Sequence, residues 1–409
     1  MLQDGTLSAR SRRAFLQLSA AASAAAALGV VTEPMLARAD RVRVFHKDGV
    51  MIDSNENPLG PGDAAREAAT GIVSQGGRYS SWLTEDLENT FAGMEGLKPE
   101  YIRSFPGSSL PLHYAVLAFT SPTKSYATAD PGFEAGVHAA ATSGARVVKV
   151  GLTKTYAHDV KAMLAAAPDA GLFYICTPNN PTGTLTSHSD IEYALQNKPS
   201  GSILLVDEAY IHFSDGTPAL DLVKADKDVV VLRTFSKIYG MAGLRCGFAI
   251  ARPDLLAKID DRGGWNAMPI TAVAAATASL KDGPLVPQRK RMNAAVRQAT
   301  FQWLDRNGYS YIPSQSNCFM VDTKRKAKDV IDGMAQQNVF IGRVWPVMPT
   351  WVRITVGTGP EMDRFQAAFQ RVMSGAVASR VTPAPAGMSD HFDGAPRRRE
   401  RAGYDSEMA

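Results

Sequence analysis

Cysteine is scarce in this chain of 409 residues, which contains only three, Cys176, Cys246 and Cys318. Their number is odd and their spacing wide, so the sequence indicates neither a disulfide framework nor a paired-cysteine zinc site. The 7 histidines show no HExxH or similar ligand spacing, which removes the commonest sequence sign of a metal enzyme. We therefore expect no bound metal, and cysteines that behave as small buried apolar residues.

An excess of charge of one sign is also missing. The formal net charge is +4, from 44 basic and 40 acidic residues, and the body left after setting apart residues 1–39 and 376–409 carries only +2. No basic footprint for nucleic acid remains. The hydrophobic fraction of 45% and charged fraction of 21% are ordinary for a globular protein, which excludes a wholly disordered chain, collagen or a coiled coil.

A long, strongly apolar run is lacking as well. The alanine-rich stretch that ends at Val31 is interrupted by polar residues and glycine, so a membrane-spanning anchor is disfavoured. Arg12 and Arg13 precede this stretch, and small residues around Ala39 follow it, a pattern typical of a twin-arginine export signal. We expect residues 1–39 to be a signal peptide read by the twin-arginine translocase, a mature chain that begins near Asp40, and a periplasmic or otherwise exported protein.

Between the two ends, short apolar runs alternate with helix-length stretches, which indicates an α/β fold with a mostly parallel sheet covered on both faces. We expect an N-terminal segment, 40–76, that joins the smaller domain, a large domain at 77–275 and a small C-terminal domain at 276–375. Residues 376–409 are rich in Ala, Pro, Gly and Ser and predict a disordered tail. The expected strands are 125–129, 146–150, 172–176, 203–206, 229–232, 248–251, 318–322, 339–342 and 352–356.

Polar residues follow three of these strands directly. Asn180 comes after strand 172–176, Asp207 and Tyr210 come after strand 203–206, and Lys237 lies beyond strand 229–232. Ligands of open α/β sheets bind beyond the carboxyl ends of the strands. An Asn, an Asp with a Tyr three residues later, and a Ser-Lys pair with Arg245 eight residues beyond are the parts needed to hold pyridoxal 5′-phosphate.

With this set of residues, the chain resembles the class I and II pyridoxal-phosphate aminotransferases of fold type I, and within them the histidinol-phosphate aminotransferase branch. The resemblance covers nearly all of residues 50–372. It implies a large domain with a mostly parallel seven-stranded sheet between helices, a smaller α/β domain and a homodimer. It also implies an enzyme, a transaminase, that moves an amino group from an amino acid or amine, histidinol-phosphate-like or aromatic, to a 2-oxo acid such as 2-oxoglutarate. The blocks that carry it are SNENPLGP at 54–61, NNPTG at 179–183, DEAY at 207–210, TFSK at 234–237, AGLRCGF at 242–248 and RITVG at 353–357.

The resemblance gives each cofactor residue a role. Lys237 is expected to bind the cofactor aldehyde covalently and then to shuttle a proton, since an amine can do both. Asp207 is expected to keep the pyridine nitrogen protonated, and its own pKa to be lowered by that cation. Tyr210 and Asn180 are expected to hydrogen-bond the phenolic oxygen of the ring. The remaining cofactor contacts are expected from Thr234, Ser236, Arg245, Ser108 and Ser109 at the phosphate, where a helix begins, and from Phe133 stacked on the ring.

The resemblance also implies residues for the substrate and the partner subunit. Arg353 is expected to bind the anionic group of the substrate through a two-pronged guanidinium contact, with Asn57 and Arg343 as further substrate residues. Tyr79 matches a tyrosine that reaches the phosphate of the neighbouring subunit. The aromatic and proline-rich stretch 345–351 is expected to face the substrate side chain and to favour a donor with an apolar or aromatic body.

Two other functions stay open from the sequence. One is a decarboxylase or lyase of the threonine-phosphate decarboxylase type, which uses nearly the same residues. Which bond breaks depends on which bond lies perpendicular to the cofactor ring, and residue spacing does not determine that. The other is a non-catalytic pyridoxal-phosphate-binding protein, although Arg353 speaks against it because a pure binder needs no substrate clamp.

Overall fold

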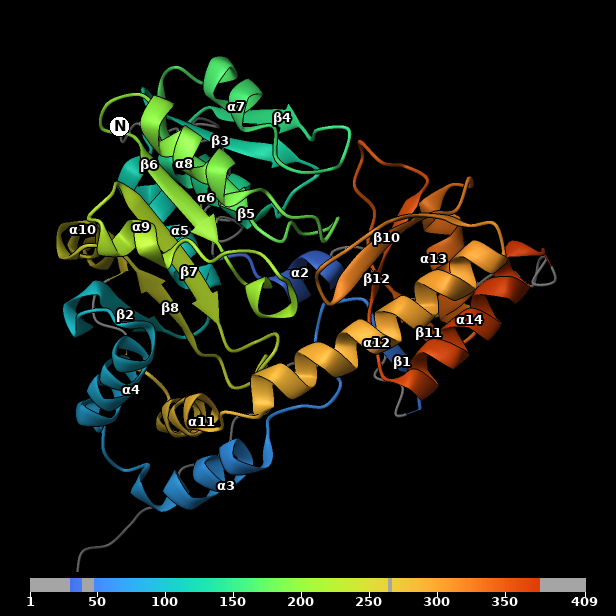
Figure 1. Cartoon of the computed structure of the whole chain (residues 1–409), viewed down its shortest axis with the longest axis horizontal. Helices are drawn as coiled ribbons and strands as arrows, with labels where there is room; N and C mark the ends of the chain where they lie inside the picture. The colour runs from blue at the N-terminus through green and yellow to red at the C-terminus, as the bar shows by residue number, and fades with distance from the viewer. Residues whose placement is uncertain (1–29, 39–47, 264–266, 376–409) are drawn as a thin grey trace, which may run out of the picture.

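The computed structural model describes residues 30–38, 48–263 and 267–375. The twin-arginine pair, the predicted cleavage site at Ala39 and the predicted tail lie outside these residues. Two domains are visible, a larger one built around a broad sheet and a smaller one at the opposite end of the molecule (Figure 1). In the described part of the chain, no helix is long and apolar enough to cross a membrane.

A seven-stranded sheet forms the centre of the larger domain, in the order β2-β8-β7-β6-β5-β3-β4. Strand β8 runs antiparallel to both β7 and β2, and every other neighbouring pair is parallel. The expected mostly parallel sheet of seven strands is therefore confirmed. In sheet order, the strands are Ile102–Phe105, Gly247–Ile250, Val229–Thr234, Ile203–Asp207, Ala170–Cys176, Ser125–Asp130 and Val147–Gly151.

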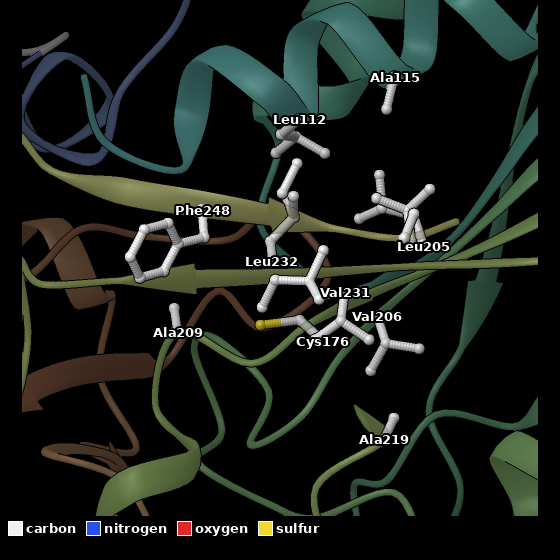
Figure 2. Close-up of a cluster of buried hydrophobic side chains, with 14 of the residues drawn as sticks. Leu112, Ala115, Cys176, Leu205, Val206, Ala209, Ala219, Val231, Leu232 and Phe248 are labelled. Carbon is white, nitrogen blue, oxygen red and sulfur yellow. The ribbon is translucent and has the colours of Figure 1, made fainter. Parts of the chain in front are cut away.

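Helices cover both faces of this sheet, which explains why its central strands are nearly continuous apolar runs. Every residue of β5, β6 and β7 is buried. Figure 2 shows Leu112 and Ala115 of α5 on one side of the strands and Val206 and Ala219 on the other. The helices of this domain are α4 (Ser81–Glu95), α5 (Ser109–Phe119), α6 (Ala135–Ser143), α7 (Val160–Ala166), α8 (His188–Asn197), α9 (Leu220–Lys224), α10 (Pro253–Gly263) and α11 (Ile270–Lys281), with 3-10 turns at Pro99–Tyr101 and Ile211–Phe213.

The smaller domain has a second apolar core of its own. Its antiparallel sheet has the order β12-β10-β9, and β1 pairs in parallel with β11 beside it. The strands are β1 (Val50–Ile52), β9 (Ser310–Ile312), β10 (Cys318–Asp322), β11 (Val339–Ile341) and β12 (Trp351–Thr355), and the helices are the C-terminal part of α12 (Leu285–Arg306), α13 (Ala327–Gln336) and α14 (Gly359–Met373).

The chain passes between the two domains at places other than the sequence suggests. Within the predicted N-terminal segment, β1 belongs to the smaller domain, whereas α3 (Asp63–Ile72), which continues into a 3-10 turn at Val73–Gln75, packs against α11. At the other end, α12 spans both domains. Its Arg289 donates to carbonyl oxygens of the larger domain's loops, while Phe301 belongs to the smaller core. The change of domain therefore falls within α12.

The three cysteines are buried and form no disulfide among the described residues, as expected for small apolar residues. Among residues 30–38, 48–263 and 267–375, no group of three or more His, Cys, Asp or Glu side chains could hold a metal ion.

Candidate active site

A cavity of about 340 Å³ lies where the carboxyl ends of β5, β6 and β7 meet the start of α5. It is the place that the strand-end argument predicts for a ligand. Ten of the eleven residues predicted to hold the cofactor line it, and the exception is Tyr79. The lining comprises Thr32, Glu33, Ser54, Glu56, Ser108, Ser109, Phe133, Cys176, Asn180, Asp207, Ala209, Tyr210, Thr234, Ser236, Lys237, Ala242, Gly243 and Arg245.

The amine of Lys237 is buried in this cavity. Its Nζ donates to the carbonyl oxygen of Asn55 at 3.0 Å and more weakly to that of Ser54 at 3.4 Å, and it lies 5.5 Å from the ring centre of Tyr210. Burial lowers the pKa of Lys237, which favours the neutral, nucleophilic amine. The lysine is therefore held without a direct carboxylate contact and is suited to attack an aldehyde.

The carboxylate of Asp207 ends strand β6 and is also buried. The Tyr174 hydroxyl donates to its Oδ2 at 2.8 Å and the Ala209 N–H to its Oδ1 at 3.2 Å. Burial raises the pKa of Asp207 to about 6, although these two hydrogen bonds and the charge of Lys237 lower it. The expected lowering of this pKa depends on the cation of the cofactor and stays a prediction, whereas in the protein by itself the loss of solvation outweighs the neighbouring donors. A cation placed against this carboxylate would bring the pKa back down.

An anion cradle lies at the start of α5. Gly107 has φ +85°, and a Cβ built on it would lie 2.1 Å from Nη2 of Arg245, so the glycine is required for the close approach of this guanidinium. Nη1 of Arg245 donates to Ser236 Oγ at 3.3 Å, and the Thr234 hydroxyl donates to the same oxygen at 2.9 Å. The first backbone N–H groups of a helix attract anions. Guanidinium, hydroxyls and helix start together make a binding place for a phosphate.

Two residues of the cavity wall, Glu33 and Asn180, contact Arg353 of β12, which is completely buried and does not itself line the cavity. Its Nη1 donates to Asn180 Oδ1 at 2.8 Å, and its Nη2 lies 2.6 Å from Glu33 Oε1. The Nδ2 of Asn180 donates to the other carboxylate oxygen, Glu33 Oε2, at 3.0 Å. Arg353 is therefore close to the cofactor residues, as expected, but a carboxylate of the protein itself lies against it.

Arg343 lies beside this group and holds a second carboxylate. Its two terminal nitrogens donate to the two oxygens of Glu134 at 2.8 Å each, and its Nη2 lies 3.6 Å from Glu33 Oε2. The Trp345 ring is 4.2 Å from the Arg343 guanidinium, is buried, and donates from Nε1 to Gly132 O at 3.0 Å. None of residues 345–351 lines this cavity, and Trp345 packs against Arg343 and Arg353. The expectation that this stretch faces the substrate stays a prediction.

Besides Arg343 and Arg353, two more predicted residues do not line the cavity. Asn57 donates to Ile238 O at 3.1 Å and accepts from the Leu59 N–H, so it connects the loop after β1 to the lysine loop. Tyr79 is 76% exposed and lines a different hollow, together with Glu88 and Arg103. Neither residue contacts the cavity within this chain.

Three residues of the site were not singled out from the sequence. Asn55 donates from Nδ2 to the Tyr210 hydroxyl at 3.0 Å, and Tyr174 supports Asp207. Asn55 lies inside the quoted SNENPLGP block, which could have found it, whereas Tyr174 is one more aromatic in a buried strand. Glu33 lies in the segment interpreted as an export signal, and nothing in its sequence surroundings points to a site.

The residues present fit pyridoxal 5′-phosphate, both in donor chemistry and in the cradle that only glycine leaves open at position 107. When bound, this cofactor withdraws electrons from the amino-bearing carbon of a substrate. Lys237 Nζ can take a proton from that carbon and return it, and Asp207 can hold a proton on a ring nitrogen. Arg245, Ser236 and the start of α5 would hold the phosphate, while Arg353 contacts Asn180 and Glu33 of the cavity wall.

Comparison with known proteins agrees with this interpretation. The family described as aminotransferase class I and II matches residues 47–369. A histidinol-phosphate aminotransferase of Symbiobacterium thermophilum is 33% identical over 330 residues, covering 80% of this chain and 91% of the relative. An aromatic amino acid aminotransferase of Cutibacterium acnes is 32% identical over 335 residues, covering 80% and 94%.

A solved structure shows the same fold. Histidinol-phosphate aminotransferase of Sinorhizobium meliloti, in complex with pyridoxal 5′-phosphate, has a TM-score of 0.73 and 26% identity, covering 80% of this chain and 91% of that one. The cavity residues, the fold and these matches agree, and the chain belongs to the class I and II aminotransferases, the pyridoxal-phosphate-dependent transaminases of fold type I.

Proposed function

We propose that this transaminase takes its amino group from an anionic donor, histidinol-phosphate-like or aromatic, and passes it to a 2-oxo acid such as 2-oxoglutarate. The observation that carries the proposal is the contact of Arg353, at 2.8 Å, with Asn180, which lines the same cavity as Lys237. A guanidinium and an amide N–H form a two-donor site for a carboxylate or phosphate oxygen pair. The relatives described above act on donors of these two kinds, judging by their names.

A single-turnover screen tests this proposal. The holoenzyme is mixed separately with histidinol phosphate, aromatic amino acids and other amino acids, and the cofactor absorbance is followed as the amino form accumulates. Addition of 2-oxoglutarate should then restore the original spectrum. Release of carbon dioxide without the amino form would favour the decarboxylase alternative, and no spectral change with any donor would favour a binding protein.

Replacing Arg353 by alanine is expected to weaken anionic donors selectively. A hydrogen-bonded charge contributes roughly 1.5–3 kcal/mol, so kcat/KM for an anionic donor should fall about 10–100-fold further than for an uncharged amine. The ratio of the two values measured on the same protein cancels any general loss of folded enzyme. An equal loss for both donors would show that the arginine is structural.

We also propose that the protein is exported in folded form by the twin-arginine translocase and processed near Ala39. The support is the Arg12-Arg13 pair before an alanine-rich, weakly apolar stretch. Replacing both arginines by lysine should leave the full-length chain in the cytoplasm, as measured by cell fractionation and N-terminal sequencing. Efficient export of the double variant, or an exported wild-type chain that still begins at Met1, would contradict the proposal.

We further propose a homodimer in which Tyr79 reaches the phosphate of the partner's cofactor. Tyr79 just precedes α4 and Trp82 lies in its first turn, and the two residues are 76% and 57% exposed. Large exposed aromatic side chains are typical of an interface. Sedimentation should give twice the chain mass, and Tyr79→Phe should weaken binding of pyridoxal 5′-phosphate. A monomer with full cofactor affinity would contradict both parts.

A further inference from the structure

The segment 30–38 enters the active-site cavity. Thr32 and Glu33 line the cavity, Val31 belongs to the core of the larger domain, and α2 (Glu33–Arg38) begins at the carboxylate itself. In Figure 1, α2 lies between the two domains. This part of the chain therefore occupies space that a substrate would need.

The contacts of the Glu33 carboxylate are those that a bound carboxylate ligand would make. One oxygen lies 2.6 Å from Arg353 Nη2 and the other accepts from Asn180 Nδ2 at 3.0 Å. Among the described residues, Arg353 has no other ion-pair partner, whereas Arg343 has its own in Glu134. Glu33 is thus the counter-ion of Arg353, and it is Glu33 that lines the cavity at this place.

We propose that Glu33 is an internal competitor that occupies the place of the substrate's carboxylate, and that a donor binds only when segment 30–38 withdraws. The inference rests on the proposed function in one respect, that the natural donor carries an anion for Arg353. It adds a property that the fold alone does not require, a carboxylate supplied by the same chain.

The charge of Glu33 is maintained at every pH at which an enzyme of this kind works. Burial by itself would raise the pKa of Glu33, but Arg353, Arg343 and Lys237 together outweigh burial and lower it to about 2. A tethered carboxylate competes as a free one would at roughly millimolar concentration. Substrate at low concentration is therefore excluded, and substrate at high concentration displaces the segment.

Few contacts hold the segment 30–38 in place. Helix α2 has only 6 residues, too few to be stable without packing. Besides the ion pair of Glu33, the segment is held by two apolar side chains that pack against the larger core, Val31 and the partly buried Leu36. Met35 is exposed. Cleavage after Ala39, as proposed above for the exported chain, would remove Glu33 entirely, so that the processed enzyme would have an open site and its precursor a closed one.

Binding of a carboxylate that cannot react tests the inference without any turnover. Succinate is titrated by calorimetry into the full-length holoenzyme, in the wild type and in the Glu33→Gln and Glu33→Ala variants. Removal of one member of a buried ion pair leaves the other uncompensated, so both variants should bind succinate at least tenfold more tightly than the wild type. Met35→Gln, in the same helix but exposed, is the matched control and should bind succinate as the wild type does.

Each outcome decides the question. Equal affinity in the wild type and both Glu33 variants, or weaker binding in the variants, would overturn the inference, since Glu33 would then be a support for the arginine and not a competitor. Thermal unfolding checks that each variant is folded, and the two substitutions guard against failure of one. Succinate has no amino group, so tighter binding in the Glu33 variants with no donor active in the screen would refute the proposed donor while leaving the competitor in place.

Discussion

Replacing Lys237 by alanine is expected to abolish amino transfer and to remove the visible absorbance of the purified holoenzyme. Its Nζ is the one lysine amine lining the cavity, and burial lowers its pKa, so no other described lysine is placed to attack an aldehyde there. Loss of both the nucleophile and the proton carrier should reduce turnover by a factor on the order of 10⁴ or more. Absorbance spectra and single-turnover conversion of the cofactor measure the two effects separately.

Lys281 provides the matched control for this substitution. It lies on α11, is 61% exposed, and makes only a long contact of 3.8 Å with Asp86. Lys281→Ala should therefore keep both absorbance and turnover. If borohydride still fixes the cofactor to a lysine of the Lys237→Ala protein, the assignment of Lys237 fails.

The sequence predicts the larger sheet well because burial on both faces leaves a strong signal. Strands β5, β6 and β7 are buried throughout, and their apolar runs match the predicted strands to within two residues. Strand β2 was not predicted, because its four residues include Arg103 and Ser104 and its antiparallel partner β8 lies about 145 positions away. A short strand of mixed polarity can be identified only from its pairing with a neighbouring strand, which the local sequence does not show.

In the candidate site too, some contacts can be predicted from the sequence and others cannot. Asp207 ends strand β6 and Lys237 lies in the loop after β7, so their meeting at one edge of the sheet follows from topology. The ion pair between Glu33 and Arg353 joins positions 320 residues apart, and neither local pattern refers to the other. For Trp345, the sequence shows an aromatic residue near the substrate arginine but not on which side of the guanidinium it packs.

Arg353 shows that a residue predicted from a sequence block can have a neighbour that the sequence does not reveal. The RITVG block predicts that it is an anion-binding arginine, and in the structure it donates to Asn180. Its complete burial would be costly without a counter-charge. Glu33 supplies that charge within this chain, so the anion site and its occupant are both built from the same sequence.

Asp207→Asn is expected to keep the cofactor in place but to slow proton abstraction by a factor on the order of 10²–10³ or more. The amide has nearly the same shape. With its oxygen toward the Ala209 N–H, its NH2 group can donate to the Tyr174 hydroxyl oxygen, so both neighbours keep a hydrogen-bond partner. It carries no negative charge, so it cannot hold a pyridine nitrogen in the protonated form. Rapid mixing with an amino donor measures this step. The control is Asp228→Asn, just before strand β7 and at the edge of the sheet away from the cavity, which should have wild-type rates.

The pH dependence of cofactor binding gives a second test of the same residue. Without a cation beside it, burial raises the pKa of Asp207 to about 6. As the pH falls below this value, the wild-type carboxylate takes up a proton and can no longer pair with a protonated ring nitrogen, so affinity for pyridoxal 5′-phosphate should fall. The cofactor's phosphate also titrates near pH 6, but it does so equally in both proteins. Only the difference between the wild-type and Asp207→Asn curves reports Asp207, and parallel curves from pH 5 to 8 would show that this carboxylate does not hold the ring nitrogen.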